Sequence, residues 1–260
     1  MARGLHAGGA LAEKSSRRTA QFGDSKEAAR SGGVLPVTRI KIIVEGQTEE
    51  SFVDAVLAPA LWHRQIYLTP ILLGVPGHKG GNVNYARVKK DILLHLRQDP
   101  AVYCSTMLDF YALGDGFPGV PPPPQLTGLQ KALIREQAIY QDILESAPDT
   151  RADLRFVPYL QVHEYEGLLF SDPDAFARGL GHQGLSLQLQ AVRNAFATPE
   201  DINDDPQSAP SKRVLGIYGS YRKVIEGTVA AQQVGVATMR QHCPHFNDWV
   251  SRLEAARPLA

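Results

Sequence analysis

The segment from residue 38 to residue 170 alternates between strand-like and helix-like patterns, and this alternation limits the fold more than any other feature of the sequence. Short β-branched or alternating runs predict strands over residues 40–44, 66–73, 101–108 and 154–162. Amphipathic segments predict helices over residues 48–61, 83–97, 127–146 and 164–170. Such alternation predicts an α/β fold, in which helices flank a mostly parallel sheet. The strand that contains Pro158 is expected at a sheet edge or a bulge, because proline donates no ladder hydrogen bond.

Both ends of the chain differ from this central segment. Residues 1–36 contain Gly, Ala, Ser and scattered charges without an apolar stretch, which indicates a disordered leader or a start codon assigned too far upstream. Residues 37–180 are predicted to form the α/β domain. Residues 181–260 are predicted to form a helical C-terminal appendage packed on it, with helices near residues 185–197, 211–226 and 244–256.

Composition excludes several classes of protein. The 27 basic and 27 acidic residues cancel, so net charge does not draw the whole chain to nucleic acid, although a local basic patch still could. Cys104 and Cys243 are far apart and form no CxxC pair, which argues against a disulfide framework. No apolar run approaches the roughly 20 residues that a membrane-spanning helix needs. These features predict a cytoplasmic protein without a membrane span, and the sequence contains no GxxxxGK[ST] loop that would make it an ATPase.

Acidic residues follow three of the predicted strands. Glu45 follows the first strand, Asp109 the third, and Glu164 and Glu166 the fourth. Because the carboxyl ends of parallel strands lie along one edge of a sheet, these side chains are expected to converge there. A cluster of carboxylates is costly unless a cation neutralises it, and Mg²⁺ prefers oxygen ligands. A metal at this edge would polarise a phosphodiester and activate water.

Each acid also has a local explanation. Glu45, Glu164 and Glu166 could stabilise the N-terminal turns of the helices that follow them. Asp109 could be an ordinary turn residue. Taken singly, each acid is explained better by its local role. Only the shared position of all four favours a metal site, so both interpretations stay open.

Two groups of basic residues are candidates for contact with a nucleic-acid backbone, because phosphate contacts come mainly from Lys and Arg. The first group follows the second predicted strand and comprises His78, Lys79, Arg87, Lys89 and Lys90. A solvated helix face explains the last three of these better. The second group, Lys212 and Arg213, follows Ser211 at a predicted helix start, where backbone N–H groups favour phosphate.

Histidines supply two further candidates. His163, beside Glu164, is a candidate general base or a residue that orients a ligand. His242, Cys243 and His245 suggest zinc, but zinc needs four ligands and no second Cys/His pair has the matching spacing. A packed helix with Pro244 in its first turn explains that segment better.

Five motifs carry a resemblance to a known family. They are residues 43–49 (IVEGQTE), 107–111 (MLDFY), 161–170 (QVHEYEGLLF), 209–213 (APSKR) and 243–246 (CPHF). Over about residues 38–256, the sequence resembles the bacterial domain-of-unknown-function family 4276. That family is similar to the TOPRIM fold of topoisomerases, primases and OLD-type nucleases. In that fold, a glutamate after the first strand and a pair of aspartates after a later strand bind Mg²⁺.

The resemblance implies roles for particular residues. Glu45 matches the glutamate and Asp109 the first aspartate, so both are implied ligands of Mg²⁺ or Mn²⁺. The second aspartate of Asp-x-Asp is replaced by Tyr111, and Glu164 or Glu166 is the expected substitute, with Asp115 a weaker candidate. This departure puts metal affinity and turnover in question.

The leading hypothesis is therefore a Mg²⁺-dependent, TOPRIM-like nuclease that cleaves DNA or RNA and uses Lys79, Lys212 and Arg213 to position the backbone. The resemblance further implies an AAA- or SMC-like ATPase partner and a role as effector in antiviral defence. Self-association into a homo-oligomer stays open. The alternatives are a non-catalytic interaction or regulatory subunit of such a system, and a phosphotransferase or hydrolase that acts on small molecules.

Overall fold

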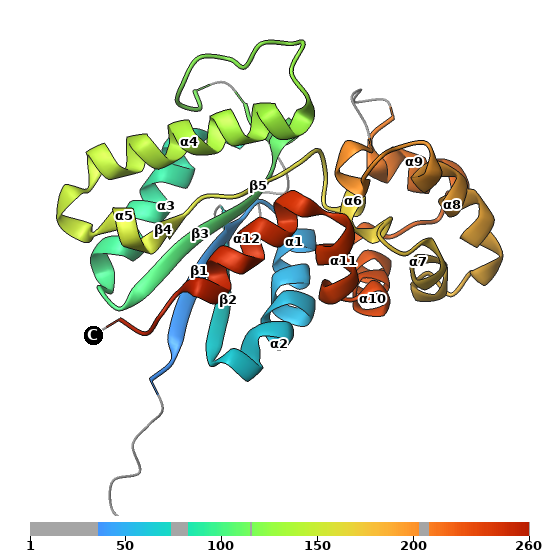
Figure 1. Cartoon of the computed structure of the whole chain (residues 1–260), viewed down its shortest axis with the longest axis horizontal. Coiled ribbons are helices and arrows are strands. Elements are labelled where there is room, and N and C mark those ends of the chain that lie inside the picture. The colour runs from blue at the N-terminus through green and yellow to red at the C-terminus, as the bar shows by residue number, and fades with distance from the viewer. Residues whose placement is uncertain (1–35, 74–82, 115, 203–207, 260) are drawn as a thin grey trace, which may run out of the picture. The chain divides into compact units, whose positions relative to one another are not determined.

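A parallel sheet forms the centre of the structure (Figure 1). The computed structural model describes residues 36–73, 83–114, 116–202 and 208–259. Strand β1 (Thr38–Val44) lies between β2 (Ile66–Leu72) and β3 (Val102–Asp109). Two short strands, β4 (Phe156–Val157) and β5 (Leu160–Gln161), both pair with β3. All of these pairings are parallel, which confirms the predicted α/β fold.

Helices cover both faces of the sheet, and the alternation of side chains along β1 assigns residues to each face. Ile40, Ile42 and Val44 belong to one buried cluster, whereas Ile43 belongs to another. The cluster that contains Ile43 lies under α3 (Tyr85–Gln98) and α4 (Gly128–Ser146). These two helices correspond to those predicted over residues 83–97 and 127–146. Thr127 caps α4 by accepting a hydrogen bond from the Gln130 amide at 3.2 Å, which fixes where that helix begins.

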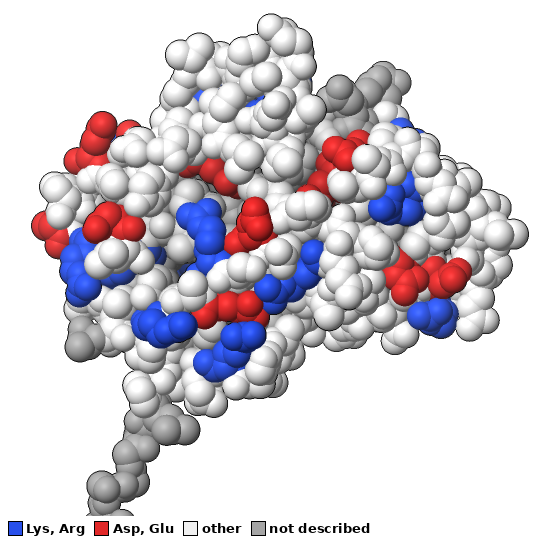
Figure 2. All heavy atoms as spheres, viewed as in Figure 1, with Lys and Arg blue, Asp and Glu red and all other residues white. Residues whose placement is uncertain are grey.

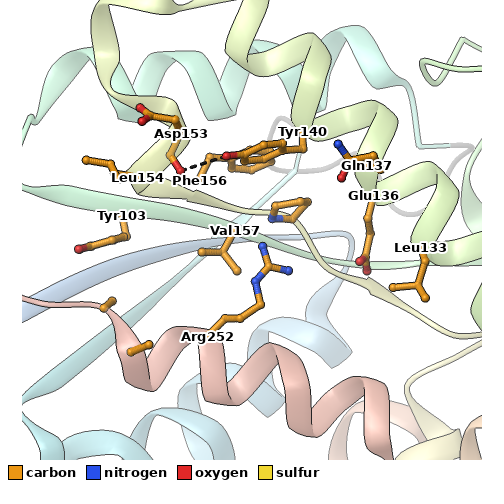
Figure 3. Close-up of a pocket in the computed structure, with 13 residues that line it drawn as sticks. Tyr103, Leu133, Glu136, Gln137, Tyr140, Asp153, Leu154, Phe156, Val157 and Arg252 are labelled. Atoms are coloured by element: carbon orange, nitrogen blue, oxygen red, sulfur yellow. Dashed lines mark hydrogen bonds between the residues drawn. The ribbon is translucent and has the colours of Figure 1, made fainter.

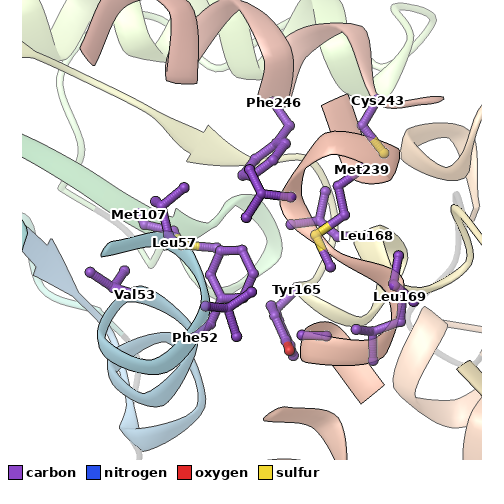
Figure 4. Close-up of a cluster of buried hydrophobic side chains, with 14 of the residues drawn as sticks. Phe52, Val53, Leu57, Met107, Tyr165, Leu168, Leu169, Met239, Cys243 and Phe246 are labelled. Carbon is purple, nitrogen blue, oxygen red and sulfur yellow. The ribbon is translucent and has the colours of Figure 1, made fainter. Parts of the chain in front are cut away.

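The opposite face is covered by the helix that follows β1 and by the C-terminal helices. The chain continues from α1 (Gln47–Phe52) through a π-helical turn (Val53–Leu57) into α2 (Ala58–Leu61), where one helix was predicted. Figure 4 shows Phe52 of α1 among Met107 of β3, Leu168 of α6 and Phe246 of α12. The sheet and the helical C-terminal region therefore share one core on this face, within a compact unit that spans residues 36–260.

The prediction for the fourth strand was partly wrong. Leu154 lies in a short helix, α5 (Ala152–Arg155), and the strand is divided into β4 and β5 at Pro158. Side chains of β3 bridge this gap: Ser105 Oγ donates to the Val157 carbonyl at 2.6 Å, and Thr106 Oγ1 accepts from the Tyr159 amide at 2.9 Å. These hydroxyls replace the ladder bonds that proline interrupts.

The helical region after β5 has more elements than the sequence predicted. It comprises α6 (Glu166–Leu169), α7 (Pro173–Gly179), α8 (Ser186–Asn194), α9 (Pro210–Ile217), α10 (Lys223–Val234), α11 (Val236–His242) and α12 (Pro244–Ala255). The single helix predicted over residues 211–226 is interrupted, so Lys223 is the first residue of α10 rather than an interior residue. None of the helices in the described ranges is long and apolar enough to cross a bilayer.

The segment from His242 to His245 joins the end of α11 to the start of the packed helix α12, with Pro244 in the first turn of α12 as the sequence favoured. Pro244 begins α12, and both carboxylate oxygens of Glu200 accept hydrogen bonds from the amides of His245 and Phe246, at 3.0 and 2.9 Å. The His245 Nε2 atom lies 2.9 Å from Glu136 Oε1, and both side chains are buried. His245 therefore joins α12 to α4 through a buried contact with the Glu136 carboxylate.

The His245–Glu136 pair makes stability depend on pH. Burial lowers the pKa of His245, but the hydrogen bond and charge of Glu136 outweigh burial and raise that pKa above its usual value. A raised histidine pKa stabilises the fold fully below the unfolded pKa, and this contribution is lost as pH rises through the folded pKa.

We expect Glu136→Gln to lower the free energy of unfolding by about 2 kcal/mol at pH 6 and by less at pH 9, measured by urea denaturation. Glu145→Gln, at an exposed position of the same helix, is the matched control and is expected to change stability little at either pH. An equal effect of Glu136→Gln at both pH values would contradict a charged pair.

Candidate functional site

Strand pairing brings the first two predicted acids together. β1 and β3 pair in parallel with Val44 opposite Met107, so the residues that follow lie at the same edge of the sheet. Glu45 is the first residue after β1, and Asp109 is the last residue of β3 and is buried. The two are close enough for the backbone amide of Asp109 to lower the pKa of the Glu45 carboxyl. The convergence expected of a parallel sheet is thus seen for this pair.

The other two predicted acids come from the segment after β5. Glu166 is the first residue of α6 and is fully buried. Glu164 Oε2 accepts a hydrogen bond from the Ser211 amide at 2.9 Å, so this carboxylate caps the start of α9. The charges of Glu166 and Glu45 both raise the pKa of Asp109, and that of Glu164 raises the pKa of Glu45. Electrostatic interactions therefore link the four acids in a chain, from Glu164 through Glu45 and Asp109 to Glu166.

Two further charged residues belong to this site and were not predicted as part of it. Glu49 is buried, and its Oε2 atom accepts a hydrogen bond from the Gly46 amide at 3.1 Å. Lys223 Nζ lies 3.2 Å from Glu166 Oε2. We call Glu45, Glu49, Asp109, Glu164 and Glu166 the carboxylate cluster. The sequence placed Glu49 at a helix start but gave no sign of Lys223, which is 57 residues from Glu166 and enters the site only through the fold.

Burial dominates the electrostatics of the cluster. Burial and then the charge of Glu49 raise the pKa of Glu45 to about 7, against an opposing effect of Lys223. Burial also raises the pKa of Glu166 to about 7, although Lys223 lowers it, and burial raises the pKa of Asp109 well above its usual value. For Lys223, the neighbouring carboxylates outweigh burial and raise its pKa. The cluster therefore holds more negative charge than the protein environment favours.

Several carboxylate oxygens in the cluster have no hydrogen-bond partner among the described residues. Glu45 Oε2, Asp109 Oδ1 and Glu166 Oε1 are buried and accept no hydrogen bond. A buried acceptor without a partner is costly, and such atoms in a native fold are typical of a bound water, ion or ligand. The donor chemistry fits a hard divalent cation, which binds carboxylate oxygens.

The geometry limits how many side chains hold such an ion. In the part of the chain that the structure describes, no three His, Cys, Asp or Glu side chains are arranged so that they could hold a metal together. Mg²⁺ often binds through one or two carboxylates and keeps several waters. The pair Glu45 and Asp109 fits that mode without a third protein ligand.

His163 and Tyr111 form a second feature beside the strand ends. The two rings stack with their centroids 4.9 Å apart and their planes at 18°. His163 is buried and has a φ of 67°, a left-handed conformation that few residues other than glycine adopt, although histidine does so more often than most. Its ring also lies against Gly128, where an added Cβ would come within 2.6 Å of His163 Cε1. Tyr111, at the position expected for a second aspartate, therefore belongs to a packed arrangement.

The predicted basic residues have different surroundings. Lys212 is exposed in the first turn of α9. Arg213 is held in place, because its Nε donates to the Ser208 carbonyl at 2.8 Å and its guanidinium lies 5.1 Å from the centre of the Phe196 ring. Lys79, His78 and Asp115 lie outside the described residues.

The molecular surface shows where other sites could lie. On the face in Figure 2, basic and acidic side chains are interspersed, and the described residues form no continuous basic surface there. A pocket of about 480 Å³ opens between α4 and α12 beside β4, with walls that include Tyr140, Phe156 and Arg252 (Figure 3). No member of the carboxylate cluster lines this pocket. The pocket is therefore separate from the predicted site.

Comparison with known proteins identifies one family. A family model described as "Domain of unknown function (DUF4276)" matches residues 44–254, a range that includes the whole carboxylate cluster and Lys223. Searches of curated proteins and of solved structures returned no significant match.

The excess negative charge predicts an unusual effect of removing Glu45. At pH 8, above its raised pKa, Glu45 carries a charge that the folded state disfavours. We expect Glu45→Gln to raise the free energy of unfolding at pH 8 by on the order of 1 kcal/mol, measured by urea denaturation without divalent cations.

Glu50→Gln, in the first turn of the helix that follows Glu45, is the control and should leave stability unchanged or slightly lower. If Glu45→Gln instead destabilises the protein, Glu45 serves only as a favourable acid at the N-terminus of α1.

Proposed function

We propose that this chain, which belongs to the DUF4276 family, is a Mg²⁺-dependent nuclease that hydrolyses nucleic-acid phosphodiesters. The observation that carries the proposal is the meeting of Glu45 and Asp109 at the ends of adjacent parallel strands, each with a buried oxygen that accepts no hydrogen bond. Ligands of α/β proteins commonly bind at this edge of the sheet. We also propose that the fold is TOPRIM-like, because carboxylates at the ends of β1 and β3 agree with such an arrangement.

Glu45 and Asp109 would hold the metal from rigid positions. Asp109 ends a strand whose eight residues are all buried, so its carboxylate has little freedom to move. Glu45 is only partly buried and leaves the ion accessible to solvent and substrate. A bound divalent cation would polarise the phosphodiester and lower the pKa of a bound water. His163, the predicted base or orienting residue, packs against Tyr111 and would fix the rim of the site.

Basic residues near the cluster would position the backbone of the substrate. Lys212 lies next to Ser211, whose amide is bonded to Glu164 of the cluster, so α9 joins the basic segment to the acids. Lys212 is exposed and available for a phosphate, whereas Arg213 already contacts Ser208 and Phe196. The Ser211 amide itself is occupied by Glu164, so the side chain of Lys212 is the better phosphate contact of this helix.

The proposal also includes a cellular role and a partner. A cytoplasmic effector of antiviral defence with an AAA- or SMC-like ATPase partner follows from the family resemblance, and the absence of a P-loop sequence from the chain agrees with an ATPase supplied separately. The second candidate is a non-catalytic regulatory subunit. It is favoured by one observation, the packing of Tyr111 on His163 at the position of a second metal-binding aspartate.

A nuclease assay separates these functions. The purified chain is incubated with single- and double-stranded DNA and RNA in Mg²⁺ or Mn²⁺, with and without the proposed AAA- or SMC-like ATPase partner. We expect the cleavage rate to fall in Glu45→Gln and in Asp109→Asn by more than ~100-fold. Losing a group that only supports a metal ligand can cost that much, and losing the ligand itself should cost more. Glu145→Gln, far from the cluster on α4, should cleave like the wild type.

Three outcomes would count against the nuclease. Equal cleavage by wild type and both variants would point to a contaminating enzyme. Hydrolysis of nucleotides without cleavage of polymers would favour an enzyme of small-molecule phosphates. Metal binding without any hydrolysis, even with the ATPase present, would favour the regulatory subunit.

A further inference from the structure

Among the described residues, Lys223 is the positively charged side chain that contacts the carboxylate cluster. It is the first residue of α10, and its Nζ atom lies 3.2 Å from Glu166 Oε2. The Glu166 side chain is fully buried, whereas 36% of the Lys223 side chain is exposed. The ammonium thus reaches into the cluster from the surface.

Glu166 depends on this contact. A buried carboxylate without a counter-charge costs several kcal/mol, and removing one partner of a buried pair is strongly destabilising. Tyr221 and Tyr165 surround Glu166 closely enough for its charge to raise the pKa of both hydroxyls, and neither is a cation. Lys223 therefore neutralises a carboxylate that the fold has already taken out of solvent.

The ammonium also opposes a metal near Glu166. Two positive charges a few ångströms apart repel each other strongly in a partly buried site. A divalent ion bound to Glu166 would have to displace Lys223 or share the carboxylate with it. The charge of Lys223 also acts on Asp109, but its ion pair is with Glu166, and Asp109 Oδ1 is buried without a hydrogen-bond partner among the described residues, which points to a further ligand.

We propose that Lys223 divides the carboxylate cluster, holding Glu166 as a fixed ion pair and leaving Glu45 and Asp109 to bind a single divalent cation. Lys223 takes the place that a second metal ion would otherwise have. This inference rests on the metal site of the proposed function and not on cleavage of any substrate.

The test counts bound Mn²⁺ by isothermal titration and by electron paramagnetic resonance of the free ion, so no activity is needed. The wild type should bind one Mn²⁺ per chain. Lys223→Met, which keeps most of the aliphatic stem, should bind two, because Glu166 then lacks its counter-charge. Lys90→Met, at an exposed position of α3, is the matched control and should bind one.

Glu166→Gln provides a test that does not depend on Lys223→Met folding. It should still bind one Mn²⁺, because Glu166 is not a ligand, but more weakly than the wild type, because the charge of Lys223 near Asp109 is then unpaired. The double variant Lys223→Met, Glu166→Gln leaves neither charge unpaired and should also bind one. Glu45→Gln and Asp109→Asn should each weaken binding by about tenfold or more.

Three results would contradict the proposed division of the cluster. Two Mn²⁺ ions in the wild type, one in a folded Lys223→Met, or loss of binding in the double variant, which has no unpaired charge, would each overturn the division of the cluster. One Mn²⁺ bound as expected but no cleavage of nucleic acid would leave this inference standing and count against the nuclease alone.

Discussion

The parallel pairing of β1 with β3 is the constraint on which the rest of the structure depends. It runs from Arg39 opposite Val102 to Val44 opposite Met107, and it brings Glu45 and Asp109 to neighbouring positions at the edge of the sheet. A shift of one residue would exchange the two faces of β1 and move Ile40, Ile42 and Val44 out of their shared core. The same hydrophobic pattern that selects the register therefore also fixes the two carboxylates.

Two buried charged side chains elsewhere among the described residues make several hydrogen bonds each, and the carboxylate cluster differs from them. Arg155 donates to the carbonyls of Leu96, Asp99, Val102 and Thr150, and Glu200 accepts from two amides at the start of α12. In the cluster, by contrast, Asp109 and Glu166 retain buried oxygens without hydrogen bonds. Unsatisfied groups held in place by a rigid sheet are typical of binding and catalytic sites, where local stability is lower than it could be.

The sequence predicted those parts of the molecule that follow from local patterns. Periodicity located the first three strands, and α3 and α4, because these segments are regular and their apolar faces are long. The acids were found because strand ends in a parallel sheet share an edge. The breaks at Pro158 and between α9 and α10 depend on tertiary contacts, such as the β3 hydroxyls that replace the missing ladder bonds. Lys223 was missed for this reason: as an interior helix residue it had no visible partner.

Formal charges link Tyr111 to Lys223. Glu49 and Glu164 already accept hydrogen bonds from the amides of Gly46 and Ser211, so each stabilises a helix start. Glu166 pairs with Lys223, so Glu45 and Asp109 are the two members of the cluster that are bonded neither to the ammonium nor to a helix-start amide, and their two charges match one divalent cation. An aspartate in place of Tyr111 would add a third negative charge and favour a second cation. The tyrosine and the lysine thus act in the same direction, because one withholds a carboxylate and the other supplies an ammonium.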